Sequence, residues 1–223
     1  MKVISCEVMR RTSRPPSASP NPISAITPPG LTWTTLPDHQ HPFVGFDNAA
    51  AAYDLAQQVL SRGRHKIAMI AGHAITNDRA REGIKGVRHA MGDAGLTIIY
   101  DQSIERDYSS KSGAEAFETL FGAISKPTAI ICGNDVLAVG AISKALDMGL
   151  SVPRDISIVG FDNIELAQVT CPQLATVHVP HEQMGKAAAE VLIKLKNGEA
   201  SVESVILDTH FVQRGSLGDA SEV

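Results

Sequence analysis

Short apolar runs alternate with longer segments of helical periodicity from about residue 31 onward. Apolar runs of about four to eight residues are typical of buried strands, whereas apolar residues three and four positions apart indicate a helix with one buried face. The pattern predicts strands within residues 30–36, 42–48, 66–72, 96–101, 128–135, 156–163, 173–180 and 204–214. It predicts helices at residues 49–63, 79–95, 112–124, 136–149 and 181–198.

The alternation of strands and helices predicts the fold class. Strands joined by helices pair in parallel through right-handed crossovers, and the helices then cover both faces of the sheet. The run KIAMIAG (66–72) is apolar along almost its whole length, as expected of a strand that is buried on both faces. We therefore expect an α/β protein with a parallel sheet flanked by helices.

Composition narrows the class of protein. The chain has 223 residues, 43% of them hydrophobic, and its net charge of −4 is not that of a general polyanion binder. Three scattered cysteines indicate reduced thiols rather than a disulfide framework or a zinc site. The sequence has no run of about 20 apolar residues and no secretory signal, so we expect a cytoplasmic protein without a membrane partner.

Proline is concentrated at the start of the chain, where residues 1–42 contain eight of the 12 prolines. Proline lacks a backbone N–H and breaks regular structure. Residues 1–30 are therefore predicted to be a Pro-rich, disordered segment.

Polar side chains follow several predicted strands, at the edge where open α/β sheets bind ligands. They are Asn77, Arg79 and Arg81 after the strand at 66–72, Tyr108 before the helix at 112–124, Asn134 at the end of the strand at 128–135, and Asp162 at the end of the strand at 156–163. Carboxylates accept from hydroxyls, amides donate and accept, guanidinium groups bind oxygen in a fork, and aromatic rings stack on rings. The set predicts a site for a small hydroxyl-rich or ring-shaped molecule.

These residues also fit structural roles. Asn48 and Asp135 stand where helix caps are expected, and Asp162 fits a turn. The two arginines equally fit a solvated helix face, and Tyr108 fits a packing ring.

The sequence contains no GxSxG, HExxH or GxxxxGK[ST] motif, and its eight histidines form no metal-ligand pattern. We therefore expect a binding protein that is not an enzyme and needs no metal or cofactor. Two alternatives stay open: a periplasmic-type sugar-binding protein, which the missing signal peptide disfavours, and an α/β enzyme acting on a small polar substrate, for example through a carboxylate pair.

The stretch ICGNDVLAVGAISKALDMGLSVPRDISIVGFDN (131–163) combines ND-x-x-A-x-G with a following V-P-x-D-I-S-x-V-G-F-D. With this pattern, the chain from about Leu31 to Arg214 resembles the effector-binding core of the LacI/GalR family of bacterial transcriptional repressors. The resemblance implies a type I periplasmic-binding-protein-like fold of two lobes. It further implies a small effector between the lobes, usually a sugar or related metabolite, and a homodimer that binds operator DNA.

By position, the resemblance assigns effector contacts to Arg81, Asn134 and Asp162, with Tyr108 as an aromatic ring against the ligand. His181 falls near the mouth of the pocket, and Trp33 is a candidate from the other lobe. The sequence departs from the family at Gly83, where an arginine is usual, so the arginine of the pocket is either Arg79 or Arg81.

The resemblance also implies a division into lobes. Residues 47–178 would form a complete second lobe, residues 31–46 and 180–212 part of the first lobe, and residues 213–223 a tail. From the sequence alone, the last nine residues are expected to be frayed. Family members begin with a helix-turn-helix, which the Pro-rich residues 1–30 do not provide. Either the true start lies upstream or the chain is a truncated regulator, and operator binding by the chain as written is not expected.

The pentapeptide VGFDN occurs twice, at Val44–Asn48 and at Val159–Asn163. The first copy is expected to start a helix capped by Asp47 and Asn48, and the second to put Asp162 at the rim of the pocket. We interpret the repeat as shared strand-to-turn chemistry and not as an internal duplication.

Overall fold

The computed structural model describes residues 42–96, 103–199 and 201–220. Its helices are α1 (Asn48–Leu60), α2 (Asp78–Asp93), α3 (Ser110–Phe121), α4 (Asp135–Asp147), α5 (Leu166–Val169) and α6 (His181–Lys196). Its strands are β1 (Val44–Gly45), β2 (Ile67–Ala71), β3 (Ser103–Glu105), β4 (Ala129–Cys132), β5 (Ser157–Val159), β6 (Thr176–His178), β7 (Val205–Ile206) and β8 (His210–Val212). Trp33, the Pro-rich residues 1–30, the strand at 30–36 and most of the strand at 96–101 lie outside the described residues.

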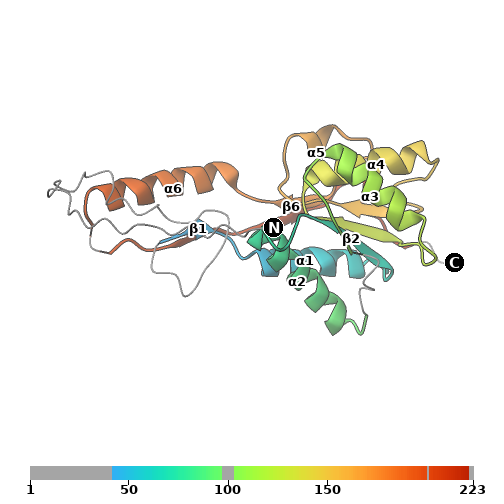
Figure 1. The fold of residues 1–223 in the computed structure, drawn as a ribbon, viewed down its shortest axis with the longest axis horizontal. Helices are drawn as coiled ribbons and strands as arrows, with labels where there is room; N and C mark the ends of the chain where they lie inside the picture. Colours follow the sequence, from blue (N-terminus) through green and yellow to red (C-terminus); the bar gives the residue numbers. More distant parts are fainter. Residues whose placement is uncertain (1–41, 97–102, 200, 221–223) are drawn as a thin grey trace, which may run out of the picture.

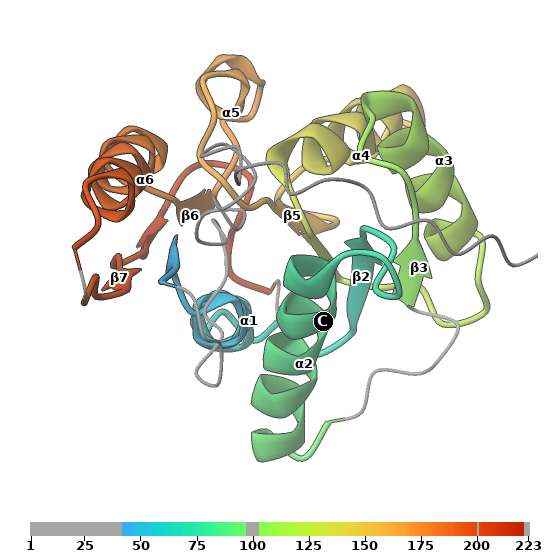
Figure 2. The ribbon, with the colours of Figure 1, turned by 60° about the vertical axis from the view of Figure 1, so that its left-hand side comes forward.

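A parallel sheet in the order β3-β2-β4-β5 forms the centre of the larger part of the molecule (Figure 1). Helices α1 and α2 lie on one face of this sheet and α3 and α4 on the other (Figure 2). Side chains of β2 alternate between the two cores: Ile67, Met69 and Ala71 pack under α1 and α2, and Ala68 and Ile70 under α3 and α4. The predicted α/β fold is confirmed.

Glycine lets the paired helices approach closely. A Cβ at Gly86 of α2 would collide with the carbonyl oxygen of Ala49 in α1, and a Cβ at Gly140 of α4 would collide with the carbonyl oxygen of Ser110 in α3. Glycine lowers helix propensity by about 1 kcal/mol relative to alanine. At these two positions, close helix packing accounts for the presence of glycine.

A smaller part of the molecule lies to one side of the main sheet. There β1 and β7 pair in parallel and α6 lies beside them (Figure 1). Strands β6 and β8 form an antiparallel pair near the main sheet, and bridges join Val159 to Ala175 and Asp162 to His178. The chain around β6 therefore borders β5 and connects the two parts.

The prediction of a single strand at 204–214 is wrong, because this segment contains the two strands β7 and β8. Val205 pairs with Val44 in the smaller part, whereas Phe211 pairs with Val177 next to the main sheet. Two different sheets use the segment, so it serves as a second connection between the two parts.

The prediction of a frayed tail is wrong for residues 215–220, the part of it that the structure describes. Ser216 and Leu217 are buried, and the hydroxyl of Ser216 donates to the carbonyl oxygen of Ile158 in β5 at 2.5 Å. The guanidinium of Arg64 is buried and donates to five carbonyl oxygens, those of Thr128, Pro153, Arg154, Gly218 and Asp219. These hydrogen bonds hold the end of the chain against the outer edge of β5.

Candidate functional site

A cavity of about 150 Å³ opens at the carboxyl ends of β2 and β4, next to the turn that follows β5. Four polar side chains that the sequence singled out line it: Arg79 from the first turn of α2, Tyr108 from the loop before α3, Asn134 between β4 and α4, and Asp162 after β5. Parallel strands bring their carboxyl ends to one edge, which explains why residues distant in the sequence meet here.

Asn134 both caps a helix and lines the cavity. Its Oδ1 accepts from the backbone N–H of Leu137 at 2.9 Å, which satisfies one of the N–H groups at the start of α4. The cap engages the amide oxygen, so Nδ2 is the group through which Asn134 can donate to a ligand.

Asp135 does not cap α4, contrary to the structural role that we considered for it. Its carboxylate is buried and accepts from the hydroxyl of Thr176 at 2.6 Å and from the backbone N–H of Ile164 at 2.8 Å. Burial raises the pKa of Asp135 to about 6, although both hydrogen bonds favour the ionised form. Asp135 thereby joins α4, the turn after β5 and strand β6.

Asp162 stands in an unusual backbone conformation. Its φ is 107° and that of Asn163 is 55°, both in the region that non-glycine residues rarely adopt. Backbone hydrogen bonds hold the turn, since the N–H of Asp162 donates to Val177 O at 3.0 Å and the N–H of Val179 donates to Asp162 O at 3.4 Å. Asp162 is therefore a turn residue, which was the alternative role considered for it. Its side chain nevertheless lines the cavity.

The electrostatic surroundings of Asp162 oppose ionisation. Burial and, to a lesser degree, the nearby Asp135 carboxylate raise the pKa of Asp162 to about 7, against the lowering effect of the Arg79 guanidinium. A cation or a hydrogen-bond donor on a ligand would therefore shift Asp162 toward its charged form.

Tyr108 lies against the backbone at the end of β2. A Cβ on Gly72 would collide with the Tyr108 ring, so glycine is required there for the ring to reach the cavity. The hydroxyl of Tyr108 is 3.4 Å from Nδ2 of Asn77. Burial raises the pKa of the phenol, and the ring remains about 40% exposed. Tyr108 is thus neither a fully packed ring nor a freely solvated one.

Asn77 and His181 contact residues of the cavity wall but do not line the cavity themselves. Asn77 caps α2 through Oδ1, which accepts from the N–H groups of Arg79 and Ala80. His181 begins α6, and its Nε2 is 3.1 Å from the carbonyl oxygen of Asp162. Trp33 lies outside the described residues.

Arg81 does not share the cavity with Asn134 and Asp162, so the expected convergence of these three side chains is wrong. Its Nη1 donates to the carbonyl oxygen of Ala74 at 3.2 Å, and its Nε is 3.7 Å from Oε1 of Glu82. Arg79 is the arginine that lines the cavity.

Sequence reasoning missed three residues of the cavity wall. Phe46 and Phe161 stack with ring centroids 6.0 Å apart, and Asn48, which we considered only as a cap, is buried and lines the cavity while its Nδ2 donates to Phe46 O. Asp47 is the residue that caps α1, through a hydrogen bond from the N–H of Ala50. All three missed residues lie in the two copies of the pentapeptide VGFDN. That repeat was the signal in the sequence that could have pointed to them.

Within the described ranges, no group of three or more His, Cys, Asp or Glu side chains is arranged to hold a metal ion. Across the same ranges, every helix is too short or too polar to cross a bilayer.

Comparison with known proteins defines the class. The model of a family described as a periplasmic binding protein-like domain matches residues 56–217. Catabolite control protein A of Priestia megaterium is 35% identical over 175 residues, which cover 78% of this chain and 53% of the relative. The HTH-type transcriptional repressor PurR of Photobacterium profundum is 38% identical over 160 residues, covering 70% and 48%.

Solved structures agree with these relatives. Transcription regulator CcpA of Lactococcus lactis superposes with a TM-score of 0.78 at 29% identity, covering 85% of this chain and 69% of that one. A complex of the transcriptional regulator CelR with cellobiose gives a TM-score of 0.77 at 26% identity, covering 83% and 57%. The chain therefore belongs to the LacI family of transcriptional regulators and contains their periplasmic-binding-protein-like core.

The chain spans about half the length of the curated relatives that it matches. Those relatives are transcriptional regulators and not enzymes, as the sequence predicted for this chain, and they favour a regulator over a periplasmic sugar-binding protein. The raised pKa of Asp162 has a structural cause in burial and in the neighbouring Asp135, so it does not require catalysis.

Proposed function

We propose that this chain senses a small polar effector, of the sugar or related metabolite class, and that effector binding modulates the affinity of a homodimeric, cytoplasmic regulator for operator DNA. The observation that carries the proposal is the convergence of Arg79, Tyr108, Asn134 and Asp162 on one cavity. Asp162 accepts from ligand hydroxyls, Asn134 donates through Nδ2, Arg79 binds oxygen, and Tyr108 lies against a ring face.

Several relatives support the effector class and the regulatory role. The PurR relatives are named as transcriptional repressors, and the CelR structure is a complex with cellobiose. Operator binding would use a helix-turn-helix of the kind for which the PurR relatives are named.

We further propose that residues 47–178 form one lobe of the sensor and that residues 31–46 and 180–212 belong to the other. The connections that run through β6 and β8 would then act as the hinge. Asp135 hydrogen-bonds both Ile164 beside the cavity and Thr176 in β6, which ties the cavity to one connection. An effector shifts such a hinge only by its difference in affinity for the two lobe arrangements.

A thermal-shift screen with monosaccharides, disaccharides including cellobiose, sugar phosphates and nucleosides tests the proposal. We expect at least one compound to stabilise the chain by about 2.7 kcal/mol at 100 times its Kd. Chromatography of the recovered compound should return it unchanged, since a sensor does not turn its ligand over. Light scattering with and without the compound tests the homodimer.

Two arginines provide a matched control. Arg79→Ala should abolish the ligand-induced shift, whereas Arg81→Ala, two residues along the same helix but outside the cavity, should retain it. Equal loss in both variants, or no response to any compound in the screen, would remove the sensor proposal.

A further inference from the structure

The turn that carries Asp162 is held by side chains from both connections between the two parts of the molecule. Asn163 follows Asp162 directly. Its side chain contacts His178 of β6 and Arg214, which lies two residues after β8. Arg214 also donates from Nη1 to the carbonyl oxygen of Leu174, two residues before β6, at 2.7 Å. One amide side chain therefore joins the turn beside the cavity to the segments of β6 and β8.

The hydrogen bonds of the Asn163 side chain have a fixed direction. A guanidinium carries only N–H donors, so the atom of Asn163 that meets Nη2 of Arg214 at 2.6 Å is the amide oxygen. The NH2 group of the same amide therefore faces Nδ1 of His178 at 3.1 Å. Because this group can only donate, Nδ1 accepts, which requires a neutral imidazole with its proton on Nε2. We call this directed series, from Arg214 through Asn163 to His178, the Asn163 relay.

Protonation of His178 breaks the Asn163 relay. The imidazolium carries an N–H on both ring nitrogens, so its Nδ1–H would meet the NH2 group of Asn163, donor against donor. Turning the amide of Asn163 over does not restore the contact, because its NH2 group would then meet the guanidinium of Arg214. The Asn163 relay therefore exists only while His178 is neutral.

The groups that face His178 from the neighbouring elements are themselves basic. From β8, the ring of His210 lies with its centroid 4.8 Å from that of His178, and from the start of α6 the imidazole of His181 faces it. Arg214 adds a permanent positive charge behind Asn163. Burial lowers the pKa of His178, and His210 and His181 lower it further. His178 is therefore neutral at pH 7 and takes up a proton only in more acidic solution.

The carboxyl groups next to the turn do not offset a charge on His178. Asp162 is bridged to His178 through the backbone, but its pKa is about 7, so this carboxyl is itself largely protonated in acidic solution. The carboxylate of Asp135 accepts from the hydroxyl of Thr176 at 2.6 Å and from the N–H of Ile164 at 2.8 Å. It is thus engaged with the turn and with β6 at a position two residues before His178.

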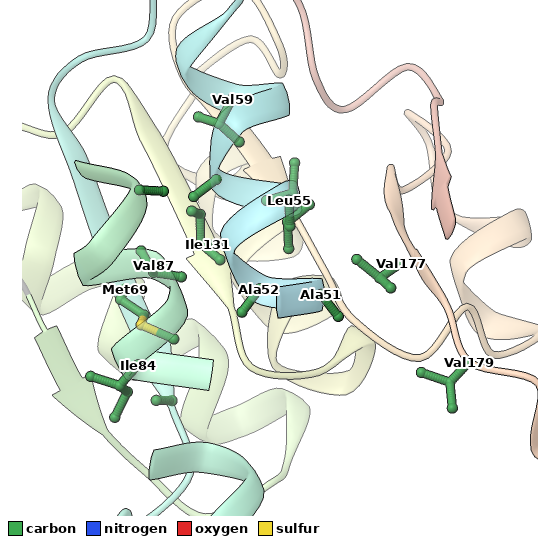
Figure 3. Packing of buried hydrophobic residues seen from close by; sticks show 14 of the residues in the cluster. Ala51, Ala52, Leu55, Val59, Met69, Ile84, Val87, Ile131, Val177 and Val179 are labelled. Carbon is green, nitrogen blue, oxygen red and sulfur yellow. The ribbon is translucent and has the colours of Figure 1, made fainter. Parts of the chain in front are cut away.

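His178 belongs to the connection and not to the core. Its neighbours Val177 and Val179 are members of the apolar cluster that includes Ala51 of α1 (Figure 3). Side chains alternate along a strand, so His178 projects from the other side of β6, where it meets Asn163.

The turn depends on such contacts. Asp162 and Asn163 have φ values of 107° and 55°, and two successive non-glycine residues in this region persist only where the surrounding structure holds them. One of the backbone hydrogen bonds of the turn, from the N–H of Val179 to Asp162 O, is long at 3.4 Å. The Asn163 relay adds side-chain support next to Asp162, so its loss loosens the position of the Asp162 carboxyl.

We propose that Asn163 is a positioning residue for the effector, which holds Asp162 in place through the Asn163 relay, and that proton uptake by His178 releases it. Acidification then weakens effector binding beyond the effect of Asp162 titrating itself. By linkage, a bound effector keeps His178 neutral. The statement about the effector rests on the proposed sensing function, whereas the release of the turn is a property of the chain without ligand.

Hydrogen exchange of the unliganded full chain, followed by nitrogen-15 NMR between pH 5.5 and pH 8, tests the release. The reporter is the N–H of Asp162. The reference is the N–H of Gly133 at the end of β4, which donates to Ile70 O at 2.7 Å. Relative to this reference, protection of Asp162 should fall about tenfold as His178 protonates, the effect of leaving one donor unpaired. The imidazole nitrogen-15 signals report the protonation of His178 in the same samples.

Asn163→Asp should reverse this pH dependence. A carboxylate accepts from the guanidinium of Arg214 and from a protonated His178, and aspartate tolerates the φ of 55°. Protection of Asp162 should therefore rise as the pH falls, and the pKa of His178 should rise as well. A side chain that only filled space at position 163 would not invert the sign.

Two histidine variants complete the set. His178→Gln keeps an acceptor for the NH2 group of Asn163 but takes up no proton, so the tenfold fall in protection of Asp162 should be lost. His210→Gln is the matched control, because it removes the neighbouring imidazole and leaves the Asn163 relay intact, and it should retain the fall. Circular dichroism checks that each variant is folded.

Cellobiose, one of the disaccharides of the thermal-shift screen, is the probe for effector binding. At pH 7.5 the wild type and His178→Gln should bind it within about twofold of each other, and at pH 5.5 the wild type should bind about tenfold more weakly, as expected when one hydrogen bond is lost. Comparing the two proteins at one pH cancels the titration of Asp162, which they share.

The outcomes separate this inference from the sensing function. Protection of Asp162 that does not follow the protonation of His178, or that falls equally in Asn163→Asp, overturns the inference. Equal affinities of the wild type and His178→Gln for cellobiose at pH 5.5 overturn it as well. If protection behaves as expected and cellobiose binds neither protein, the release of the turn is supported and the sensing function fails for this disaccharide.

Discussion

Phe46 and Phe161 stack in the wall of the cavity, with ring centroids 6.0 Å apart and ring planes inclined by 24°. Each ring is the third residue of a VGFDN pentapeptide. The two copies therefore meet in space: the first leads from β1 into α1, and the second leads from β5 into the turn at Asp162. One copy lies beside the smaller part of the molecule and the other at the main sheet, so the stack spans the region that connects them.

A double-mutant cycle should detect this stack. Stacked aromatic pairs contribute about 0.5–1.5 kcal/mol beyond the area that they bury. Phe46→Leu and Phe161→Leu should each lower the free energy of unfolding in urea. The double variant should lose less than the sum of the two single losses, and the difference, the coupling energy, should lie in this range. Additive losses would mean that the rings are neighbours without a specific interaction.

The raised pKa of Asp162 predicts the pH dependence of stability. Its pKa in the folded chain is about 7 against an ordinary value of 3.8, so between about pH 4 and pH 7 the folded chain holds a proton that the unfolded chain has released. The free energy of unfolding contributed by this group therefore falls as pH rises through that window. Asp135, with a pKa of about 6, contributes in the same direction over the lower part of it.

Asp162→Asn should make this decline shallower and should raise stability at pH 8, while abolishing the response to a sugar-like ligand. Asparagine tolerates a positive φ about as well as aspartate, so the backbone at φ 107° should persist. Urea unfolding at half-unit steps from pH 4 to pH 8 measures the effect. Asp54→Asn, on the exposed face of α1, is the control. If the free energy of unfolding depended on pH in the same way in both variants, the prediction would be contradicted.

A pair of histidines at the connection gives the opposite pH dependence. The rings of His178 in β6 and His210 in β8 have centroids 4.8 Å apart, and the two residues are paired in the strand register. Burial lowers the pKa of His178, and the nearby His210 and His181 lower it further. Protonation is therefore less favourable in the folded chain, so this group costs stability as pH falls below about 6.5.

His178→Gln should remove that cost. The glutamine amide can replace the contact at 3.1 Å between Nδ1 of His178 and Nδ2 of Asn163. The stability of the variant relative to wild type should rise between pH 7 and pH 5, as measured by urea unfolding. A difference between the two proteins that stays constant over this range would show that the imidazole charge has no role.

The sequence predicted the sheet and four residues of the cavity rim because both depend on local pattern. Asn134 and Asp162 end apolar runs, and in a parallel sheet the ends of such runs lie at one edge. Arg79 and Arg81 could have been separated by helical phase: Arg79 is four residues before Gly83 and eight before the buried Val87, whereas Arg81 shares a face with the exposed Lys85.

Other features had no local signal. The contact of Phe46 with Phe161 depends on how distant segments meet, which no window of the sequence encodes. The fixed position of the segment that ends at residue 220 depends on Arg64. This arginine lies 154 residues before its partner Gly218 and 155 before its partner Asp219. A polar, glycine-containing segment such as this one is expected to fray by composition, and here long-range hydrogen bonds and the burial of Leu217 hold it in place.

Arg64 gives the sharpest stability prediction. Its buried guanidinium is an anchor for the loop at Pro153 and for the chain end at Gly218, through hydrogen bonds of 2.7 Å to Pro153 O and 3.2 Å to Gly218 O. Arg64→Met keeps the length of the side chain but leaves these carbonyl oxygens without their donor. Since removing one side of a buried charged hydrogen-bond network costs about 3–5 kcal/mol, we expect a loss of that order in the free energy of unfolding.

Arg62→Met, two residues earlier, is the matched control for this loss. Arg62 also reaches the chain end, through Gln213 at 3.1 Å and Asp219 at 3.6 Å, but its ion pair is exposed and should contribute at most about 1 kcal/mol. Hydrogen exchange should localise the effect, with Arg64→Met lowering protection at Ile158 and Ser216, whose backbone groups are hydrogen-bonded. Similar urea midpoints for the two variants would mean that the chain end is held by burial of Leu217 and not by Arg64.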